Sequence, residues 1–242
     1  MCIKTVATKL ISFDATNTLL LFRQPGAQTY LEHGKHLNGL IPAKIAESFR
    51  DAYTDYSEKY PCFGYGQFGA QEWWLRVARQ TYISAGVAVD DPGLQCTVEQ
   101  VYEHFNTTQP WQIHKSARAL LTQLTKTRHK IVIASNFDPR LYNLFRLFKI
   151  DHYFDAIFLS SLIGVQKPDQ RFFQTIFDRF PQLEPSEMVH VGDSYENDYL
   201  GATATGMKAL LFVPQCKMCE LTEDVRKTAE IVNDLAEIVA KI

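Results

Sequence analysis

Four short segments of the chain carry side chains that could act together on a phosphoryl group. The residues are Asp14 in the segment FDATNT, Ser135 and Asn136 in KIVIASN, Lys167 in GVQKPD, and Asp193 and Asp198 in MVHVGDSYEND. Magnesium prefers oxygen ligands and binds through one or two carboxylates together with phosphate oxygens of the substrate. An aspartate in that setting can attack phosphorus and form an aspartyl-phosphate, and a lysine neutralises charge on the phosphoryl oxygens. Each residue alone is typical of a helix cap or a turn, but together they predict one magnesium-dependent site.

The elements that must position these side chains are apolar, β-rich runs. Five such runs occur, at Leu10–Phe13, Ile131–Ala134, Ile157–Leu159, Met188–Val191 and Ala209–Val213. Helical patterns lie between them, at 117–126, 140–148 and 171–180. This alternation predicts an α/β fold with a doubly wound, mainly parallel, Rossmann-like sheet. Ligands bind beyond the carboxyl ends of such strands, so the four segments are expected to converge there.

The interval between the first and second of these segments has a different pattern. It contains helical runs around 43–56, 71–85 and 94–105 and no convincing β pattern. Pro25-Gly26 and Gln109-Pro110 supply breaks near its two ends. The sequence therefore predicts an all-helical domain at 23–108, inserted after the first strand of a Rossmann-like core that comprises 1–22 and 109–242.

Composition limits the possible partners and the location. The chain has 242 residues, of which 46% are apolar, and 25 basic against 27 acidic residues give a formal charge of −2. Without a basic excess we expect no nucleic acid partner, and without a long apolar run we expect no membrane insertion. The first residues do not resemble a secretion signal, and the five scattered cysteines do not form a disulfide framework. We therefore expect a cytoplasmic protein, with its oligomeric state left open.

In these segments the chain resembles the haloacid dehalogenase superfamily. The motifs of that family are Asp-x-Asp-x-Thr, a strand-end Ser or Thr, a Lys, and Gly-Asp-x(3,4)-Asp. They match residues 14–18, Ser135, Lys167 and residues 192–198. The helical interval at 23–108 looks like the cap domain of the family. The resemblance therefore covers the whole chain and implies a hydrolase that acts on a small phosphorylated molecule.

The resemblance also implies a role for each matching residue. Asp14 would be the nucleophile and a magnesium ligand. The other ligands would be the backbone carbonyl of Thr16, Asp193 and, in a supporting position, Asp198. The phosphoryl group would be held by Thr18, Ser135, Asn136 and Lys167.

The chain departs from the family pattern at Thr16. Phosphatases of the family have a second aspartate there, which protonates the leaving group, and a threonine hydroxyl does not titrate near neutral pH. General acid–base catalysis is typically worth about 10²–10⁴-fold. We therefore expect weak activity on alkyl phosphates and a preference for good leaving groups, such as acyl phosphates. Asn17 replaces the usual glycine, and asparagine tolerates a positive φ better than most residues.

Two alternatives stay open at this point. The chain could bind a phosphate ligand in a regulatory role without useful turnover. It could also attack carbon, as the metal-free dehalogenases do, although the intact pair Gly192-Asp193 argues against this. His33, His36 and His104 are candidates for proton transfer from the cap, but isolated histidines of this kind are more typical of a surface.

Three further patterns carry less weight. The segment GYGQFG at residues 64–69 fits Gly-x-Gly-x-x-Gly but follows a helical run, whereas dinucleotide binding needs a preceding strand. Cys216 and Cys219 form a Cys-x-x-Cys without a second pair at zinc spacing. The aromatic residues Trp73, Trp74, Phe63, Tyr65 and Phe68 are typical of a core in the helical interval, and some could close over a substrate.

Overall fold

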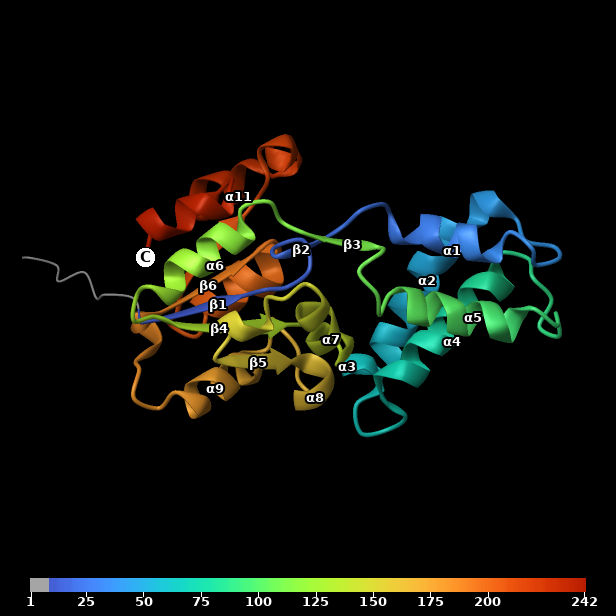
Figure 1. Ribbon diagram of the computed structural model, residues 1–242, viewed down its shortest axis with the longest axis horizontal. Coiled ribbons are helices and arrows are strands. Elements are labelled where there is room, and N and C mark those ends of the chain that lie inside the picture. Colours follow the sequence, from blue (N-terminus) through green and yellow to red (C-terminus); the bar gives the residue numbers. More distant parts are fainter. Residues whose placement is uncertain (1–8) are drawn as a thin grey trace, which may run out of the picture. The chain divides into compact units, whose positions relative to one another are not determined.

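The computed structural model describes residues 9–242, which divide into two compact units (Figure 1). The first unit comprises 9–21, 113–137 and 149–242, and the second comprises 22–112 and 138–148. The second unit thus contains the helical interval and, in addition, a short segment that follows the strand carrying Ser135. Each unit is described by itself below.

The first unit is built on a six-stranded parallel sheet. Its strands are β1 (Leu10–Phe13), β4 (Lys130–Ser135), β5 (Ala156–Leu159), β6 (Met188–Gly192), β7 (Lys208–Phe212) and β8 (Ile231–Val232). The strand order is β5-β4-β1-β6-β7-β8, so β1 lies between β4 and β6 and the direction of winding reverses there. The five apolar runs correspond to β1, β4, β5, β6 and β7, which confirms the predicted fold class. The short edge strand β8 was not predicted.

Helices cover both faces of this sheet. Figure 1 shows α6 (Ala117–Thr125) and α11 (Glu223–Thr228) on one side of it and α9 (Gln170–Arg179) on the other. The remaining helical segments of the unit are short: η2 (Asp151–Tyr153), α8 (Ser160–Ile163), η3 (Pro185–Glu187), η4 (Tyr195–Leu200), α10 (Gly201–Thr203), η5 (Gln215–Glu220) and η6 (Leu235–Ala240). Alternate residues of a strand point to opposite faces, so β4 is buried along both of them.

Helix α9 shows how sequence dictates local structure in this unit. The Asp169 side chain accepts a hydrogen bond from the backbone N–H of Arg171 and so caps the first turn. Phe172, Phe173 and Ile176 recur at helical spacing and are fully buried. They pack in one cluster with strand residues that include Leu10, Val132, Ala134, Met188 and Ala209. Burial of these side chains holds the helix against the sheet.

The second unit is helical. Its helices are α1 (Gly26–Gly34), η1 (Pro42–Lys44), α2 (Ile45–Lys59), α3 (Pro61–Gly64), α4 (Gly69–Ser84), α5 (Leu94–His104) and α7 (Arg140–Leu147). The three predicted helical runs correspond to α2, α4 and α5, whereas α1 was not predicted. Buried residues form two clusters, one around Tyr30, Tyr82 and Val98 and one around Trp73 and Val77. A two-stranded sheet of β2 (Leu20–Phe22) and β3 (Trp111–Ile113) contains two of the positions where the chain passes between units.

Helix α7 belongs to the second unit because of a buried polar cluster at its start. Asp138 accepts a hydrogen bond of 2.8 Å from the indole N–H of Trp74 in α4. The guanidinium of Arg140 lies over the rings of Trp74 and Tyr102, at 5.0 and 4.7 Å from their centroids. These contacts join α7 to α4 and α5.

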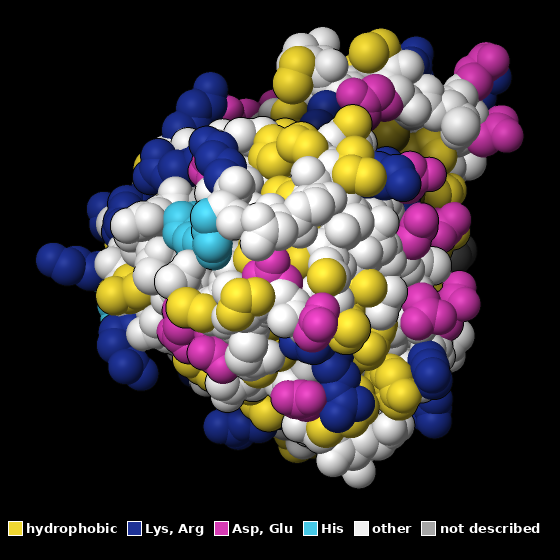
Figure 2. All heavy atoms as spheres, turned by 90° about the vertical axis from the view of Figure 1, so that its right-hand side faces the viewer, with side chains coloured by type: hydrophobic (Ala, Val, Ile, Leu, Met, Phe, Trp, Pro, Cys, Tyr) yellow, Lys and Arg dark blue, Asp and Glu magenta, His cyan; other side chains and the backbone are white. Residues whose placement is uncertain are grey.

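The surface and the helices bear on possible partners. Figure 2 shows both acidic and basic side chains on the face that it draws, in keeping with the nearly balanced composition. Within residues 9–242, no helix has the length and apolar character needed to cross a membrane.

Candidate active site

The site lies where the carboxyl ends of three neighbouring strands meet. Asp14 directly follows β1, Ser135 ends β4, and Asp193 directly follows β6. In the parallel register Phe13 lies beside Ile133 on one side and Val191 on the other, so the residues that follow are neighbours in space. The structure thus brings these side chains together at the reversal of strand order, where ligands bind in open α/β sheets.

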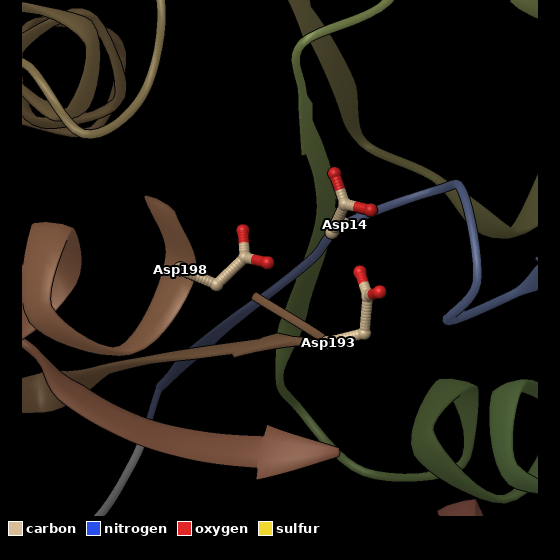
Figure 3. A group of neighbouring side chains, drawn as sticks. All are labelled: Asp14, Asp193 and Asp198. Atoms are coloured by element: carbon tan, nitrogen blue, oxygen red, sulfur yellow. The ribbon is translucent and has the colours of Figure 1, made fainter. Parts of the chain in front are cut away.

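Three carboxylates form the centre of this site. Asp14, Asp193 and Asp198 each offer an oxygen, and these oxygens lie within 4.8 Å of one another (Figure 3). Asp14 and Asp198 are buried, whereas Asp193 is partly exposed. Burial and the charges of Asp14 and Asp198 raise the pKa of Asp193 to about 7. Burial also raises the pKa of Asp14, against the opposing effect of Lys167.

Asp198 reaches this group through a tight turn after β6. Ser194 caps the helical turn η4, since its side chain accepts a hydrogen bond from the backbone N–H of Asn197. That turn brings Asp198 back over Gly192. A Cβ atom on Gly192 would lie 2.2 Å from Cγ of Asp198, so only glycine permits this approach. The glycine of the Gly-Asp pair therefore serves the aspartate six residues later.

Lys167 is the cation that faces the carboxylates. Its Nζ is buried and lies 2.7 Å from Oδ1 of Asp14 and 2.5 Å from Oδ1 of Asp198. Burial lowers the pKa of Lys167, but the two carboxylates outweigh burial and raise it overall, so the side chain is an ammonium ion. Three carboxylates face this one ammonium group. Negative charge is therefore in excess, and the oxygen donors suit a hard divalent cation such as magnesium.

Asn136 holds the segment that carries Lys167. Its side-chain amide donates to the backbone carbonyl of Lys167 and accepts from the backbone N–H of the same residue, both at 2.9 Å. The Asn136 side chain thus fixes the lysine rather than extending freely toward a ligand. Sequence reasoning placed Asn136 at the site but did not foresee this pairing.

Ser135 and Thr18 bring hydroxyl groups to the site. Ser135 is buried, and a hydrogen bond from its side chain to Asp14 lowers the pKa of that carboxyl, against the larger effect of burial. Thr18 is also buried, and its hydroxyl has no hydrogen-bond partner among the described residues. A buried hydroxyl without a partner is costly, so a bound ligand or water at this position would be favoured.

The loop after Asp14 is a compact turn. The backbone N–H groups of Leu19 and Leu20 donate to the carbonyl of Ala15, at 3.0 and 2.7 Å, and that of Asn17 donates to the carbonyl of Leu20. Asn17 has a φ of 58°, as its tolerance for this region predicts. Its side chain also forms a hydrogen bond with Asp193, which lowers the pKa of that carboxyl against the larger effect of burial. Sequence reasoning missed this contact.

His190 is a second residue that sequence reasoning missed. Its Nε2 lies 2.9 Å from Oδ1 of Asp198, and it is fully buried in β6. Burial raises the pKa of Asp198, but Lys167 and His190 outweigh burial and hold it below its usual value. Burial lowers the pKa of His190, so the ring is neutral at pH 7. The only signal in the sequence is a histidine within an apolar strand, just before Gly192.

The remaining candidates lie in other elements of the two units. His33 and His104 lie in the second unit, where their rings are neighbours at 5.0 Å. The segment at 64–69 connects α3 and α4 without a preceding strand, as expected for a loop. Cys216 and Cys219 are exposed in η5. Trp73 and Phe63 belong to the core of the second unit, whereas Tyr65 is 51% exposed, which contradicts its assignment to that core.

Fold and site together define a class of protein. The model of the haloacid dehalogenase-like hydrolase family matches residues 8–206. The chain therefore belongs to the haloacid dehalogenase-like hydrolase family, as the motif pattern predicted.

Within this family the chain is similar to two named proteins. It is 34% identical over 212 residues to the haloacid dehalogenase-like hydrolase domain-containing protein 3 of Xenopus laevis, covering 87% of this chain and 86% of that protein. It is 32% identical over 213 residues to the rhythmically expressed gene 2 protein of Drosophila melanogaster, covering 84% and 82%. Among solved structures, YfnB from Bacillus subtilis, bound to magnesium, has a TM-score of 0.70 at 20% identity and covers 97% of this chain and 98% of that one. This last similarity concerns the fold.

Proposed function

We propose that the chain is a magnesium-dependent, phosphatase-type hydrolase in which Asp14 is the nucleophile. The observation that carries this proposal is the convergence of the Asp193 and Asp198 carboxylates on Asp14, with Nζ of Lys167 2.7 Å from Oδ1 of Asp14. Asp14, the backbone carbonyl of Thr16 and Asp193 would hold the ion, with Asp198 in a supporting position. A bound magnesium ion would supply positive charge to the phosphoryl oxygens.

The protein groups account for the remaining steps. The Asp14 carboxylate attacks phosphorus, and the bond from phosphorus to the leaving oxygen breaks, with the electron pair going to that oxygen. Water then cleaves the aspartyl-phosphate and restores Asp14. Lys167 opposes the effect of burial on the pKa of Asp14 and orients its carboxylate, and it lies where it would stabilise charge that develops during transfer. Thr18 and Ser135 would help to hold the phosphoryl group, and Asn136 would act through its two hydrogen bonds to the backbone of Lys167.

Thr16 limits the substrates. It stands in the position from which the second aspartate of a phosphatase would protonate the leaving group, and it carries no titratable group. We therefore propose weak activity on alkyl phosphates and better activity on small phosphorylated molecules with good leaving groups, such as acyl phosphates. The interval 23–108, within the second unit, would act as the cap that selects among them. A cytoplasmic location stays a prediction from the sequence.

Thr16 also favours a second candidate function. Without the general acid, the site would serve a catalytically impaired protein that binds a phosphate ligand in a regulatory role. The carbon chemistry of the metal-free dehalogenases is disfavoured, because it would use Asp14 as the nucleophile but has no metal ion for Asp193 to bind.

Hydrolysis assays on three substrate types test the proposal. Wild type, Asp14→Asn and Thr16→Asp are compared on an acyl, an aryl and an alkyl phosphate, with and without magnesium. Wild type should cleave the acyl phosphate best and only with magnesium, and Asp14→Asn should lose at least about 10³-fold, as removal of a nucleophile does. Thr16→Asp should raise alkyl phosphate turnover by about 10²–10⁴-fold.

Three outcomes of these assays would count against the proposal. Equal wild-type rates on all three substrates would refute the role given to Thr16. Full activity of Asp14→Asn would refute the nucleophile. Magnesium-dependent phosphate binding without turnover of any substrate would favour the regulatory function.

A further inference from the structure

A buried chain of polar contacts leads from the first strand to the site. Oγ of Ser12 in β1 lies 2.8 Å from Nδ1 of His190 in β6, and Nε2 of that ring lies 2.9 Å from Oδ1 of Asp198. The same carboxylate oxygen contacts Lys167, whose Nζ also contacts Oδ1 of Asp14. Ser12 and His190 are both fully buried. This series of polar contacts thus connects the adjacent strands β1 and β6 with Asp14, the proposed nucleophile.

The direction of each hydrogen bond follows from the groups involved. An ionised carboxylate only accepts, so Nε2 of His190 carries the proton in its contact with Asp198. In a neutral ring Nδ1 is then the acceptor, and the hydroxyl of Ser12 donates to it. That hydroxyl lies closer to Nδ1 than to the carbonyl of Val189, at 3.3 Å. Ser12 therefore selects the tautomer in which His190 donates to Asp198.

Asp198 is surrounded by protein donors. Its Oδ1 accepts from Lys167 and His190, and its Oδ2 accepts from the backbone N–H of Ser194 at 2.9 Å. A carboxylate held by three donors cannot turn without leaving one of them unpaired. Lys167 is then fixed between Asp198 and Asp14.

We propose that His190 and Ser12 are positioning residues, which fix Asp198 as the support of Lys167 and so place the ammonium group beside Asp14. This inference rests on the proposed function, because the placed ammonium matters for a phosphoryl ligand. In this proposal the main role of Asp198 is to hold Lys167. Asp14, Asp193 and the backbone carbonyl of Thr16 then remain as the groups that would bind the magnesium ion directly. Removal of a residue that hydrogen-bonds to a ligand-binding side chain, without contacting the ligand itself, typically changes affinity or activity by about 10–100-fold.

Two substitutions of His190 separate hydrogen bonding from packing. The ring of His190 packs edge-on against Phe173, with the centroids 5.5 Å apart. His190→Phe keeps an aromatic ring there and loses both nitrogens. His190→Gln keeps an N–H donor that can reach Asp198 and loses the ring. If His190 served only for packing, His190→Phe should resemble wild type more closely than His190→Gln does. If it positions Asp198, His190→Gln should resemble wild type more closely.

Calorimetric binding of inorganic phosphate in the presence of magnesium compares these variants. We expect His190→Phe to bind about 10-fold more weakly than wild type and His190→Gln to stay within about 3-fold of it. Ser12→Ala should weaken binding less than His190→Phe, and Ser48→Ala, which removes a buried hydroxyl in α2, should not change it. Wild-type affinity in His190→Phe, or weaker binding by Gln than by Phe, would overturn the inference.

Two measurements on the metal-free protein do not depend on the proposed function. Long-range proton–nitrogen NMR spectra should show His190 as the Nε2–H tautomer, and the Nδ1–H tautomer would overturn the inference. His190→Phe should lower the urea midpoint in wild type but much less in Asp198→Ala, and equal shifts in both backgrounds would also overturn it. If wild type bound no phosphate, the proposed function would fail, and these two measurements would still decide the role of His190.

Discussion

The two units each bury a cluster of charged side chains, and the clusters differ in their balance. In the second unit one carboxylate, Asp138, meets one guanidinium, Arg140. In the first unit three carboxylates, Asp14, Asp193 and Asp198, face the single ammonium of Lys167. Burial of a charge is tolerated when a partner compensates it. Excess charge in one cluster therefore indicates a ligand, whereas balance in the other indicates a structural role.

The geometry of the balanced cluster supports this reading. Arg140 donates from Nε and Nη2 to the two oxygens of Asp138, at 2.7 to 3.2 Å, and its guanidinium lies over two aromatic rings. Trp74 donates to the same carboxylate. In the first unit, by contrast, burial and neighbouring carboxylates raise the pKa of Asp193 to about 7. The positive charge of Lys167 is therefore too small to offset the effects of burial and of the neighbouring carboxylates on Asp193.

The largest expected effect on stability is in the balanced cluster. Arg140→Met leaves the buried Asp138 without its counter-charge, and breaking a buried pair in this way typically costs about 3–5 kcal/mol. We expect a loss of this size in the free energy of unfolding, measured by urea titration, and no recovery with magnesium.

The chain offers a matched control for this substitution. Arg171 and Asp169 repeat the same Asp-x-Arg pattern with the same set of hydrogen bonds, but their side chains are 77% and 37% exposed. Arg171→Met should leave the urea midpoint almost unchanged, because exposed ion pairs contribute little. Equal losses in the two variants would show that burial does not distinguish the pairs.

A smaller and reversible loss is expected at the unbalanced cluster. Lys167→Met removes the one ammonium group that, within residues 9–242, contacts this group of carboxylates. The carboxylates can respond by taking up protons, so we expect a loss of about 2–4 kcal/mol in the free energy of unfolding. Magnesium should restore part of this stability, since it binds the folded state and replaces the missing positive charge. A loss that millimolar magnesium leaves unchanged in urea titrations would contradict a cation site here.

The pKa of Asp193 gives a prediction with a defined sign. Folding raises the pKa of the Asp193 carboxyl from 3.8 to about 7. Such a group stabilises the folded protein fully at a pH below 3.8, and this contribution is lost as the pH rises through the folded-state pKa of about 7. Asp193→Asn removes this dependence. The variant should therefore be more stable than wild type at pH 8, on the order of 1–3 kcal/mol, and lose this advantage toward pH 4.

A direct comparison of wild type with Asp193→Asn isolates the contribution of Asp193 to the pH dependence of stability. His190 contributes a pH dependence of the opposite sign, and it does so in both proteins. The neutral, buried His190 has a lowered pKa, so its contribution falls as pH drops below 6.5. The difference between wild type and Asp193→Asn should cancel that contribution. With magnesium at pH 8 wild type should become more stable than Asp193→Asn. A difference in the free energy of unfolding that did not change with pH would refute the raised pKa of Asp193.

The sheet, and the clustering of the proposed site residues at its edge, could be predicted because both follow local rules. Buried parallel strands are apolar runs, and the ends of such runs locate Asp14, Ser135 and Asp193. The motif spacing then indicates Lys167 and Asp198. Asn17 at a φ of 58° also followed from its residue type.

What the sequence did not reveal depends on contacts between distant segments. His190 has the appearance of a core residue within an apolar strand, and its role appears only when η4 returns Asp198 to that strand. Helix α7 was predicted in length, but its place in the second unit depends on the bond between Asp138 and Trp74, 64 positions apart. No local pattern indicates either contact.

The smallest expected effect sharpens the comparison by separating two contributions within the balanced cluster. Trp74→Phe keeps an aromatic ring beneath Arg140 but removes the N–H that donates to Asp138 at 2.8 Å. A hydrogen bond to a charged group is worth about 1.5–3 kcal/mol, and partial exposure of Trp74 lets water replace some of it, so we expect a loss near the lower value in urea titrations. Trp74→Leu should lose more, because the cation–π contact is lost as well. If Trp74→Phe were as stable as wild type, the guanidinium alone would suffice for Asp138, and balance of charge rather than the number of donors would define a structural cluster.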